Sequence, residues 1–336
     1  MSYNRTFCEK ILFNKISVYR LLEFIVYGLT NLLTAFPKKI SETTLSFSIL
    51  ISGGIWGLYW IPLREIEGYG IPTYWSVFFI NACPLILILP LSLLKISHFR
   101  TSFWPTLQVG LLIGIAFTFY ASALLETTIM RATLMFYLSP IWGTIIGYFF
   151  LSEPFTRARL LSICIAIVGL VLLLSGTNNS SYPLNIGDLF AFLSGILFSC
   201  GSSILKHRPD IKMIPLTSFV YIFTSVGAFL LIIFISNEPL INIKTFLPSI
   251  PYVFMWSTII LLPSFMIVFK VSQILFPGRV AILLMSEVVV AIISASVLVP
   301  EERMFYLQWL GALAIITAGF TELVIAKFKK KSSYIP

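Results

Sequence analysis

Long runs of uncharged, mostly apolar residues dominate this chain and restrict it to one kind of fold. Ten runs come close to the length of about 20 residues needed to cross a bilayer; eight contain no charge and two contain one glutamate each. The runs are 45–63, 68–94, 101–125, 132–152, 160–187, 189–205, 213–237, 245–269, 280–300 and 304–326. Backbone polar groups in hydrocarbon must be hydrogen-bonded within the segment, so we expect helices rather than strands. The sequence therefore predicts an all-α polytopic membrane protein with ten transmembrane helices in a lipid bilayer.

The distribution of basic residues predicts how these spans are oriented. Only 11% of the 336 residues are charged, compared with about 25% in an average soluble domain. With the N-terminus placed in the cytoplasm, 19 of the 23 Lys and Arg residues fall on the cytoplasmic side. The remaining four lie outside: Arg64, Arg131, Lys244 and Arg303. This positive-inside pattern predicts that both termini are cytoplasmic. The net charge of +9 is thus a topology signal, and we expect no binding of nucleic acid.

A repeat at an offset of 148 residues divides the chain into two halves. Residues 131–153 read RATLMFYLSPIWGTIIGYFFLSE, and residues 279–301 read RVAILLMSEVVVAIISASVLVPE. Both segments begin with arginine and end with glutamate, and a repeat of membrane-spanning length is typical of duplicated transporters. We predict a first five-helix repeat at 45–175 and a second at 186–327. Because five is odd, the second repeat would insert upside down relative to the first.

The two ends of the chain fall outside these repeats. The segment 1–44 contains a short apolar stretch, 21–36, that includes Glu23 and Asn31. We interpret 1–44 as a cytoplasmic or interfacial amphipathic segment. A signal peptide and an eleventh span that crosses the membrane are the alternatives. Residues 328–336 are predicted to be a cytoplasmic tail.

Two segments and one dipeptide resemble the EamA-like drug/metabolite transporter superfamily. They are 139–153, 286–302 and Gly187-Asp188 at the head of the sixth span. The family pattern is a proline in the fourth span and Glu-Pro in the ninth, each followed about four helical turns later by Gly-Glu. The residues that match it are Pro140, Glu153, Glu287 and Glu301. The departures are Val288 in place of proline, and Ser152 and Pro300 in place of glycine.

The resemblance implies ten helices in a bacterial inner membrane, with both termini cytoplasmic. It implies movement of small organic metabolites, commonly export of amino acids or their relatives. We expect a monomer or a homodimer that uses no cofactor. The resemblance does not name the substrate.

Glu287 is the strongest candidate for a functional residue. It lies eight residues after Arg279, about 12 Å along a helix and therefore near the middle of the bilayer. An ionised carboxylate at that depth costs about 2.5–3.5 kcal/mol, so we expect it to face a cavity or to be neutral. The functional interpretation is a contact with a substrate amine or a site of proton coupling. The alternative is a structural carboxyl group hydrogen-bonded to a neighbouring helix.

Ser139 occupies the position equivalent to Glu287 in the first repeat, next to Pro140. Pro140 has no N–H group to donate to the carbonyl of Phe136. A helix broken in this way could present carbonyl groups to a substrate. It could equally be a packing kink with no ligand.

Aromatic residues suggest where a substrate would lie. Trp56, Tyr59 and Trp60 share one face of the first span, and Tyr137 and Trp142 lie in the fourth. Together they could form a pocket for a planar or cationic substrate. The alternative is packing between helices, with Trp60 as an anchor at the membrane interface.

Three classes of protein fit these features. The leading hypothesis is a secondary transporter of amino acids or related amines, in which coupling to protons rests on Glu287 alone. No GxxxxGK[ST] motif is present, so we expect no ATP-driven transport. An intramembrane enzyme would need His, Asp or Cys clustered within the spans, so we predict that the chain is not an enzyme. A receptor or scaffold that does not transport is the third possibility.

Overall fold

The computed structural model describes residues 42–94, 102–151, 184–208, 210–236, 243–274, 283–302, 304–314 and 316–318, with short helical pieces between 160 and 172. These residues form helices and connecting turns without a β-strand, which confirms the predicted all-α class. The N-terminal stretch 1–41, the tail 328–336, Glu153 and Arg279 lie outside the described residues.

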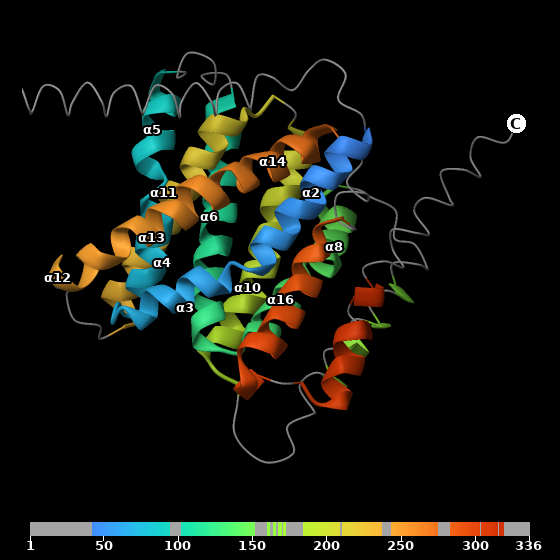
Figure 1. Ribbon diagram of the computed structural model, residues 1–336. Helices are drawn as coiled ribbons and strands as arrows, with labels where there is room; N and C mark the ends of the chain where they lie inside the picture. The colour runs from blue at the N-terminus through green and yellow to red at the C-terminus, as the bar shows by residue number, and fades with distance from the viewer. Residues whose placement is uncertain are drawn as a thin grey trace, which may run out of the picture.

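The described helices follow one another along the chain as a bundle (Figure 1). The α-helices are α2 (Glu42–Gly57), α3 (Trp60–Gly68), α4 (Thr73–Ala82), α5 (Leu85–Leu94), α6 (Phe103–Glu126), α7 (Ile129–Phe136), α8 (Ser139–Leu151), α10 (Ile186–His207), α11 (Met213–Phe234), α12 (Ile243–Phe246), α13 (Ile250–Phe254), α14 (Leu262–Ile274) and α16 (Ser286–Leu298). The 3-10 helices are η3 (Leu247–Ser249) and η5 (Pro300–Glu302), and η4 (Met255–Leu261) is a π-helix.

Six helical stretches among the described residues are long and apolar enough to cross a membrane. They are Thr44–Gly68, Thr73–Leu94, Phe103–Glu126, Ile186–His207, Met213–Phe234 and Lys244–Val271. Two shorter apolar helices are Ser286–Leu298 and Tyr306–Ala318. These spans make the chain an integral membrane protein. The total of ten spans and the inverted arrangement of the two repeats stay predictions.

Several spans are interrupted a few residues before a proline. The first span turns at Leu58–Tyr59, ahead of Pro62, and the fourth turns at Tyr137–Leu138, ahead of Pro140. The π-helix η4 ends two residues before Pro263. A proline inside a helix removes the hydrogen bond to the carbonyl four residues earlier, which explains why each irregularity lies on its N-terminal side.

Helix α6 lies at the centre of the packing, in contact with α10 and α11, while α2 packs along α16 and α14. Glycines permit the closest approaches. A Cβ atom added at Gly114 of α6 would lie 2.9 Å from the Val220 carbonyl oxygen of α11. One added at Gly57 of α2 would lie 2.5 Å from the Glu287 carbonyl oxygen of α16. Small residues of this kind let membrane helices pack backbone to backbone.

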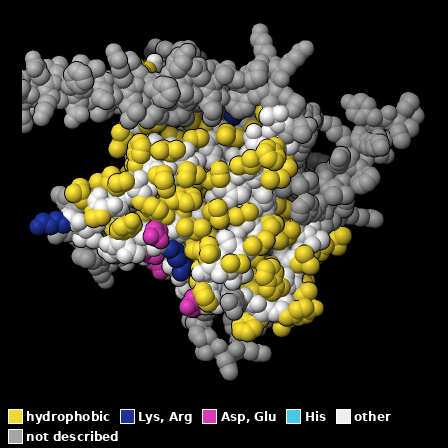
Figure 2. Space-filling model, viewed as in Figure 1, with side chains coloured by type: hydrophobic (Ala, Val, Ile, Leu, Met, Phe, Trp, Pro, Cys, Tyr) yellow, Lys and Arg dark blue, Asp and Glu magenta, His cyan; other side chains and the backbone are white. Residues whose placement is uncertain are grey.

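The outer surface of the bundle is largely apolar. Figure 2 shows hydrophobic side chains over most of the viewed face, with acidic and basic side chains confined mainly to its lower part and left edge. Phe149 and Leu94 are among the large apolar side chains that are mostly exposed. An apolar patch of this extent is not tolerated by a soluble monomer, so this surface is suited to contact with lipid.

Candidate functional site

The Glu287 side chain is buried at the first turn of α16. Only 7% of the residue is exposed. Gly57 of α2 lies against its backbone on one side, and the side chain reaches α6 and the turn after α7 on the other. The carboxylate therefore lies inside the helix bundle.

Two tyrosine hydroxyl groups hydrogen-bond to the Glu287 carboxylate, one to each oxygen. The Tyr120 hydroxyl, on α6, donates to Oε1 across 3.0 Å. The Tyr137 hydroxyl, at the turn between α7 and α8, donates to Oε2 across 2.8 Å. Both tyrosines come from the predicted first repeat, whereas Glu287 comes from the predicted second repeat. The carboxylate thus lies where the two predicted repeats meet.

Each tyrosine also has a second polar neighbour. The Tyr137 hydroxyl lies 3.0 Å from the carbonyl oxygen of Leu284, just before α16. Tyr120 lies 3.5 Å from the Thr133 hydroxyl of α7. The Phe136 ring packs between the two tyrosines, with ring-centroid distances of 4.6 Å to Tyr120 and 5.4 Å to Tyr137. The first repeat therefore surrounds Glu287 with hydroxyl groups held by ring packing.

Trp56 and Tyr59 belong to the same buried core as Tyr120 and Phe136. The Trp56 ring lies 5.2 Å from Tyr59 and 5.3 Å from Phe117 and from Phe265. Tyr59 is at the turn between α2 and α3, and its hydroxyl accepts a hydrogen bond of 3.3 Å from the Asn81 amide. Tyr59 interacts with Tyr120 and Trp56 packs on Tyr59, so these two predicted aromatic residues are linked to the carboxylate through Tyr120.

Ser139 and Trp142 make their described contacts with α10 instead. The Ser139 carbonyl accepts a hydrogen bond of 2.6 Å from Ser199, and the Trp142 ring packs 5.2 Å from Phe192. Trp142 belongs to a separate apolar cluster with Leu138. The predicted aromatic set is therefore divided between two parts of the fold.

The break caused by Pro140 brings the Phe136 carbonyl close to α10. A Cβ atom added at Gly195 would lie 2.9 Å from that oxygen. The oxygen therefore faces the backbone of a neighbouring helix, as in the packing interpretation. Pro140 is the second residue of α8, and its side chain lies outside the described part of the structure.

Trp60 is also placed differently from its expected position as an interfacial anchor. It is only 6% exposed, and its indole N–H donates to the Ser294 hydroxyl of α16 across 3.1 Å. Trp60 therefore forms a further polar contact between α3 and α16 inside the bundle.

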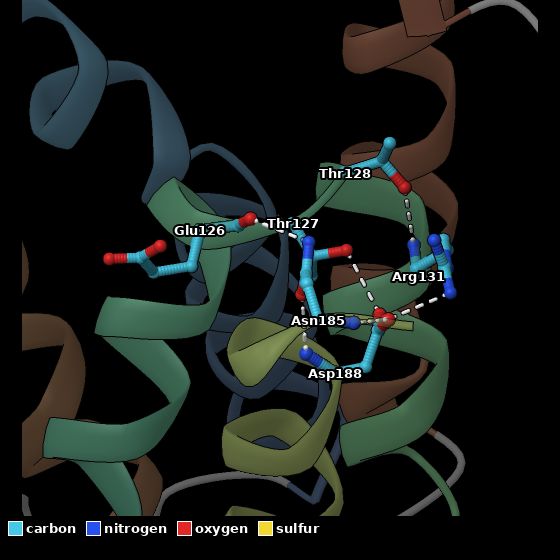
Figure 3. A network of polar contacts seen from close by, with 6 residues as sticks. All are labelled: Glu126, Thr127, Thr128, Arg131, Asn185 and Asp188. Atoms are coloured by element: carbon cyan, nitrogen blue, oxygen red, sulfur yellow. Dashed lines mark hydrogen bonds and ion pairs between the residues drawn. The ribbon is translucent and has the colours of Figure 1, made fainter. Parts of the chain in front are cut away.

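A second polar network lies where α6, α7 and α10 meet (Figure 3). The Arg131 guanidinium, on α7, forms an ion pair of 2.7 Å with Asp188 of α10. The Thr127 hydroxyl donates to Oδ1 of Asp188 across 2.9 Å. The Asn185 backbone N–H donates across 3.0 Å to Oδ2, the oxygen that is paired with Arg131. Figure 3 shows these groups directed at Asp188, while the Glu126 carboxylate points away.

Arg131 was predicted to lie on the outer side of the membrane, which the structure does not test, and it is buried in an ion pair. Its side chain is 8% exposed and that of Asp188 is 4% exposed. Buried charges are retained in proteins when they are paired and hydrogen-bonded. Counting Arg residues by loop cannot reveal such a pair, and Gly187-Asp188 was the only sequence signal for it.

Tyr120 and Asn81 were not among the site residues predicted from the sequence. Both are polar side chains within apolar spans, and this could have marked them: Tyr120 follows Thr118 and precedes Ser122 on α6. Among the described residues no group of three His, Cys, Asp or Glu side chains could hold a metal ion. The site therefore offers one carboxylate, several hydroxyl groups and aromatic rings, which suit a cation or a proton.

Comparison with known proteins supports the resemblance seen in the motifs. Residues 44–175 match the EamA-like transporter family. This confirms the resemblance over the region that supplies Trp56, Tyr59, Tyr120 and Tyr137. The matched family suggests a membrane transporter of small molecules.

Solved structures provide a comparison at the level of the fold. One structure, described only as "Crystal structure of protein", aligns with a TM-score of 0.54 and 16% sequence identity. The alignment covers 83% of this chain and 98% of that one. At this identity the likeness concerns the fold alone. No curated protein matches the sequence.

Proposed function

We propose that this chain is a secondary transporter of small organic metabolites, with amino acids or related amines favoured as substrates. It would work by alternating access between two inverted five-helix repeats, in export or exchange. The observation that carries the proposal is the Glu287 carboxylate, buried between Tyr120 of α6 and Tyr137 beside α7. A carboxylate at the meeting point of the two repeats can bind a cationic group that is exposed to each side in turn.

The chemistry of the site favours an amine. The two tyrosine hydroxyls donate to the carboxylate and leave it as the charged acceptor. Trp56, Phe117 and Phe265 add aromatic faces in the same core, and such faces attract cations. The same carboxylate could exchange a proton for the substrate, which would make the transport proton-coupled.

Interrupted helices next to the carboxylate are consistent with a transporter whose two repeats move against each other. The turn at Tyr137–Leu138 supplies one of the tyrosines, and the turn at Leu58–Tyr59 follows directly after Gly57. Transporters place discontinuous helices of this kind at central binding sites. Rocking of one repeat against the other would change the contacts of α2 and α7 with α16 first.

The sequence supports the proposed arrangement in the membrane. We propose five spans in each of 45–175 and 186–327, with 1–44 as a cytoplasmic or interfacial segment and the tail 328–336 in the cytoplasm. The location would be the bacterial inner membrane, and the state a monomer or a homodimer.

The experiment that tests this function is a comparison of metabolites in cells. Cells would overexpress the wild-type chain, Glu287→Gln or Glu301→Gln at equal membrane abundance. Glu301 is a matched control because it is an exposed glutamate near the other end of α16. We expect at least one small amine or amino acid to change between cells and medium with the wild type and Glu301→Gln, but not with Glu287→Gln. Identical metabolite profiles for wild type and Glu287→Gln would contradict the proposal.

A further inference from the structure

The Tyr137 hydroxyl lies between two acceptors. One is the Glu287 Oε2 atom at 2.8 Å, and the other is the Leu284 carbonyl oxygen at 3.0 Å. A phenol has a single proton to donate and lone pairs with which it can accept. Tyr137 therefore cannot give a full hydrogen bond to both oxygens while both are acceptors only.

The protonation state of Glu287 decides which acceptor Tyr137 serves. When Glu287 is ionised, both carboxylate oxygens are acceptors, and the charged one attracts the phenol proton more strongly. When Glu287 gains a proton at Oε2, it becomes a donor to the Tyr137 oxygen. Tyr137 then directs its own proton at the Leu284 carbonyl. Tyr137 stays neutral and keeps its proton in both states, and the only proton that enters or leaves is the one on Glu287.

The Leu284 carbonyl belongs to the backbone just before α16. Residue 285 is a turn, and α16 begins at Ser286. A hydrogen bond to this carbonyl restrains the backbone where α16 begins, and its loss removes that restraint. The position equivalent to Met285 at the offset of 148 is Tyr137 itself, so both interruptions occur at matching positions in the two halves.

We propose that Tyr137 is a positioning residue that couples the protonation of Glu287 to the backbone at the start of α16. This deepens the proposed function and rests on it, because the relay would link proton binding to movement of α16. The relay itself needs no substrate, so it can be measured independently of transport.

Among the described titratable and charged groups around Glu287, Tyr137 is the one that joins the carboxylate to the backbone before α16. Tyr120 of α6 bonds Oε1, and its second neighbour is the Thr133 side chain rather than a backbone carbonyl. Tyr59 interacts with Tyr120. On α7, Arg131 is paired with Asp188. Helix α2 presents Gly57 and has no ionisable residue from Thr43 to Gly57. At the far end of α16, Glu301 is exposed.

The test uses the full-length protein in lipid nanodiscs without a solute, over a range of pH. Infrared difference spectra report the carboxylic acid of Glu287 as the band that Glu287→Gln lacks. Hydrogen exchange of the peptide 283–290 reports the start of α16. The exchange rates of Glu287→Gln give the intrinsic dependence of amide exchange on pH. The rates of the wild type and the other variants are corrected for this dependence.

In the wild type we expect protection of this peptide to follow the infrared band. Exchange should be roughly 2- to 12-fold slower when Glu287 is protonated, the factor given by one typical hydrogen bond. In Tyr137→Phe the infrared band should remain while exchange loses its dependence on protonation. The matched control is Tyr120→Phe, which removes the other tyrosine hydroxyl. In this variant the exchange protection of the peptide should still follow the infrared band of Glu287.

Three results would overturn the relay. They are protection in Tyr137→Phe that still follows the band, wild-type protection that does not follow it, and the absence of any Glu287 band in the wild type. Failure of the proposed function would appear in a different measurement. Unchanged transport by Glu287→Gln would contradict transport through this carboxylate, whatever the exchange data show.

Discussion

The Tyr120 hydroxyl on α6 donates a hydrogen bond to the Glu287 carboxylate on α16 across 3.0 Å. The two residues are 167 positions apart in the chain, in different predicted repeats. Their contact depends on how closely α2, α6 and α16 pack. Helix packing, more than any local motif, therefore determines the geometry of the candidate site.

Replacing Gly57 by alanine should disturb this packing. The new Cβ would lie 2.5 Å from the Glu287 carbonyl oxygen and 3.0 Å from the Ala291 nitrogen. These are backbone atoms, so α16 would have to shift, at a cost of about 1–3 kcal/mol. We expect a lower unfolding temperature in nanodiscs and reduced transport.

Gly143→Ala is the control for this variant, because a Cβ atom there has nothing within 4 Å among the described residues. Its unfolding temperature should match the wild type. Equal unfolding temperatures for the two alanine variants would show that α2 and α16 are not in close contact.

Removing the carboxylate charge of Asp188 should destabilise the protein strongly. Asp188→Asn leaves Arg131 buried without its anionic partner, and breaking a buried pair costs about 3–5 kcal/mol. The unfolding temperature of the purified protein measures this loss. A change no greater than that of the control described next would mean that the pair is solvated.

The exposed pair of Arg208 and Asp210 supplies that control, with an N–O distance of 2.9 Å. The hydrogen bond from Arg208 holds the pKa of Asp210 below its usual value. A lowered pKa means that the pair stabilises the fold at neutral pH and that this contribution is lost as the pH falls through the folded pKa. Because both side chains are exposed, solvent screens the pair, and Asp210→Asn should leave the unfolding temperature nearly unchanged at neutral pH.

The aromatic candidates should separate into two groups when they are mutated. Trp56→Leu removes a ring that contacts Tyr59, Phe117 and Phe265, one residue before the glycine that packs on the Glu287 backbone. We expect it to raise the substrate concentration for half-maximal transport several-fold, as loss of a cation–π contact of about 1 kcal/mol would do. Trp142→Leu should leave that concentration unchanged, since Trp142 packs on Phe192 of α10. Equal effects in solute uptake assays would contradict this separation.

The sequence was sufficient to predict a helical membrane protein and to single out Glu287. Burying a carboxylate in an apolar span is costly, so its depth alone marks it as unusual. Proline positions also predict some of the helix breaks: the rule that was applied to Pro140 holds for Pro62 and for Pro263 beyond η4, whereas Pro90 lies inside α5 without a break. These features are local, and local rules describe them well.

The partners of Glu287 could not be predicted in the same way. A single sequence does not say which helices lie side by side, so Tyr120 could not be paired with Glu287. The count of Arg residues on each side of the membrane says nothing about their partners, so the buried pair of Arg131 with Asp188 could not be predicted. Trp142 was grouped with Trp56 by depth along the helix, although depth says nothing about the direction that a side chain takes around the bundle.

Counterflow in proteoliposomes tests the central claim most directly. Wild-type, Glu301→Gln and Glu287→Gln proteins would be reconstituted at equal density and loaded with the amine or amino acid found in the metabolite comparison. The account predicts transient accumulation of labelled solute for the first two and none for Glu287→Gln. Counterflow by Glu287→Gln at the wild-type rate and with the wild-type dependence on pH would contradict it.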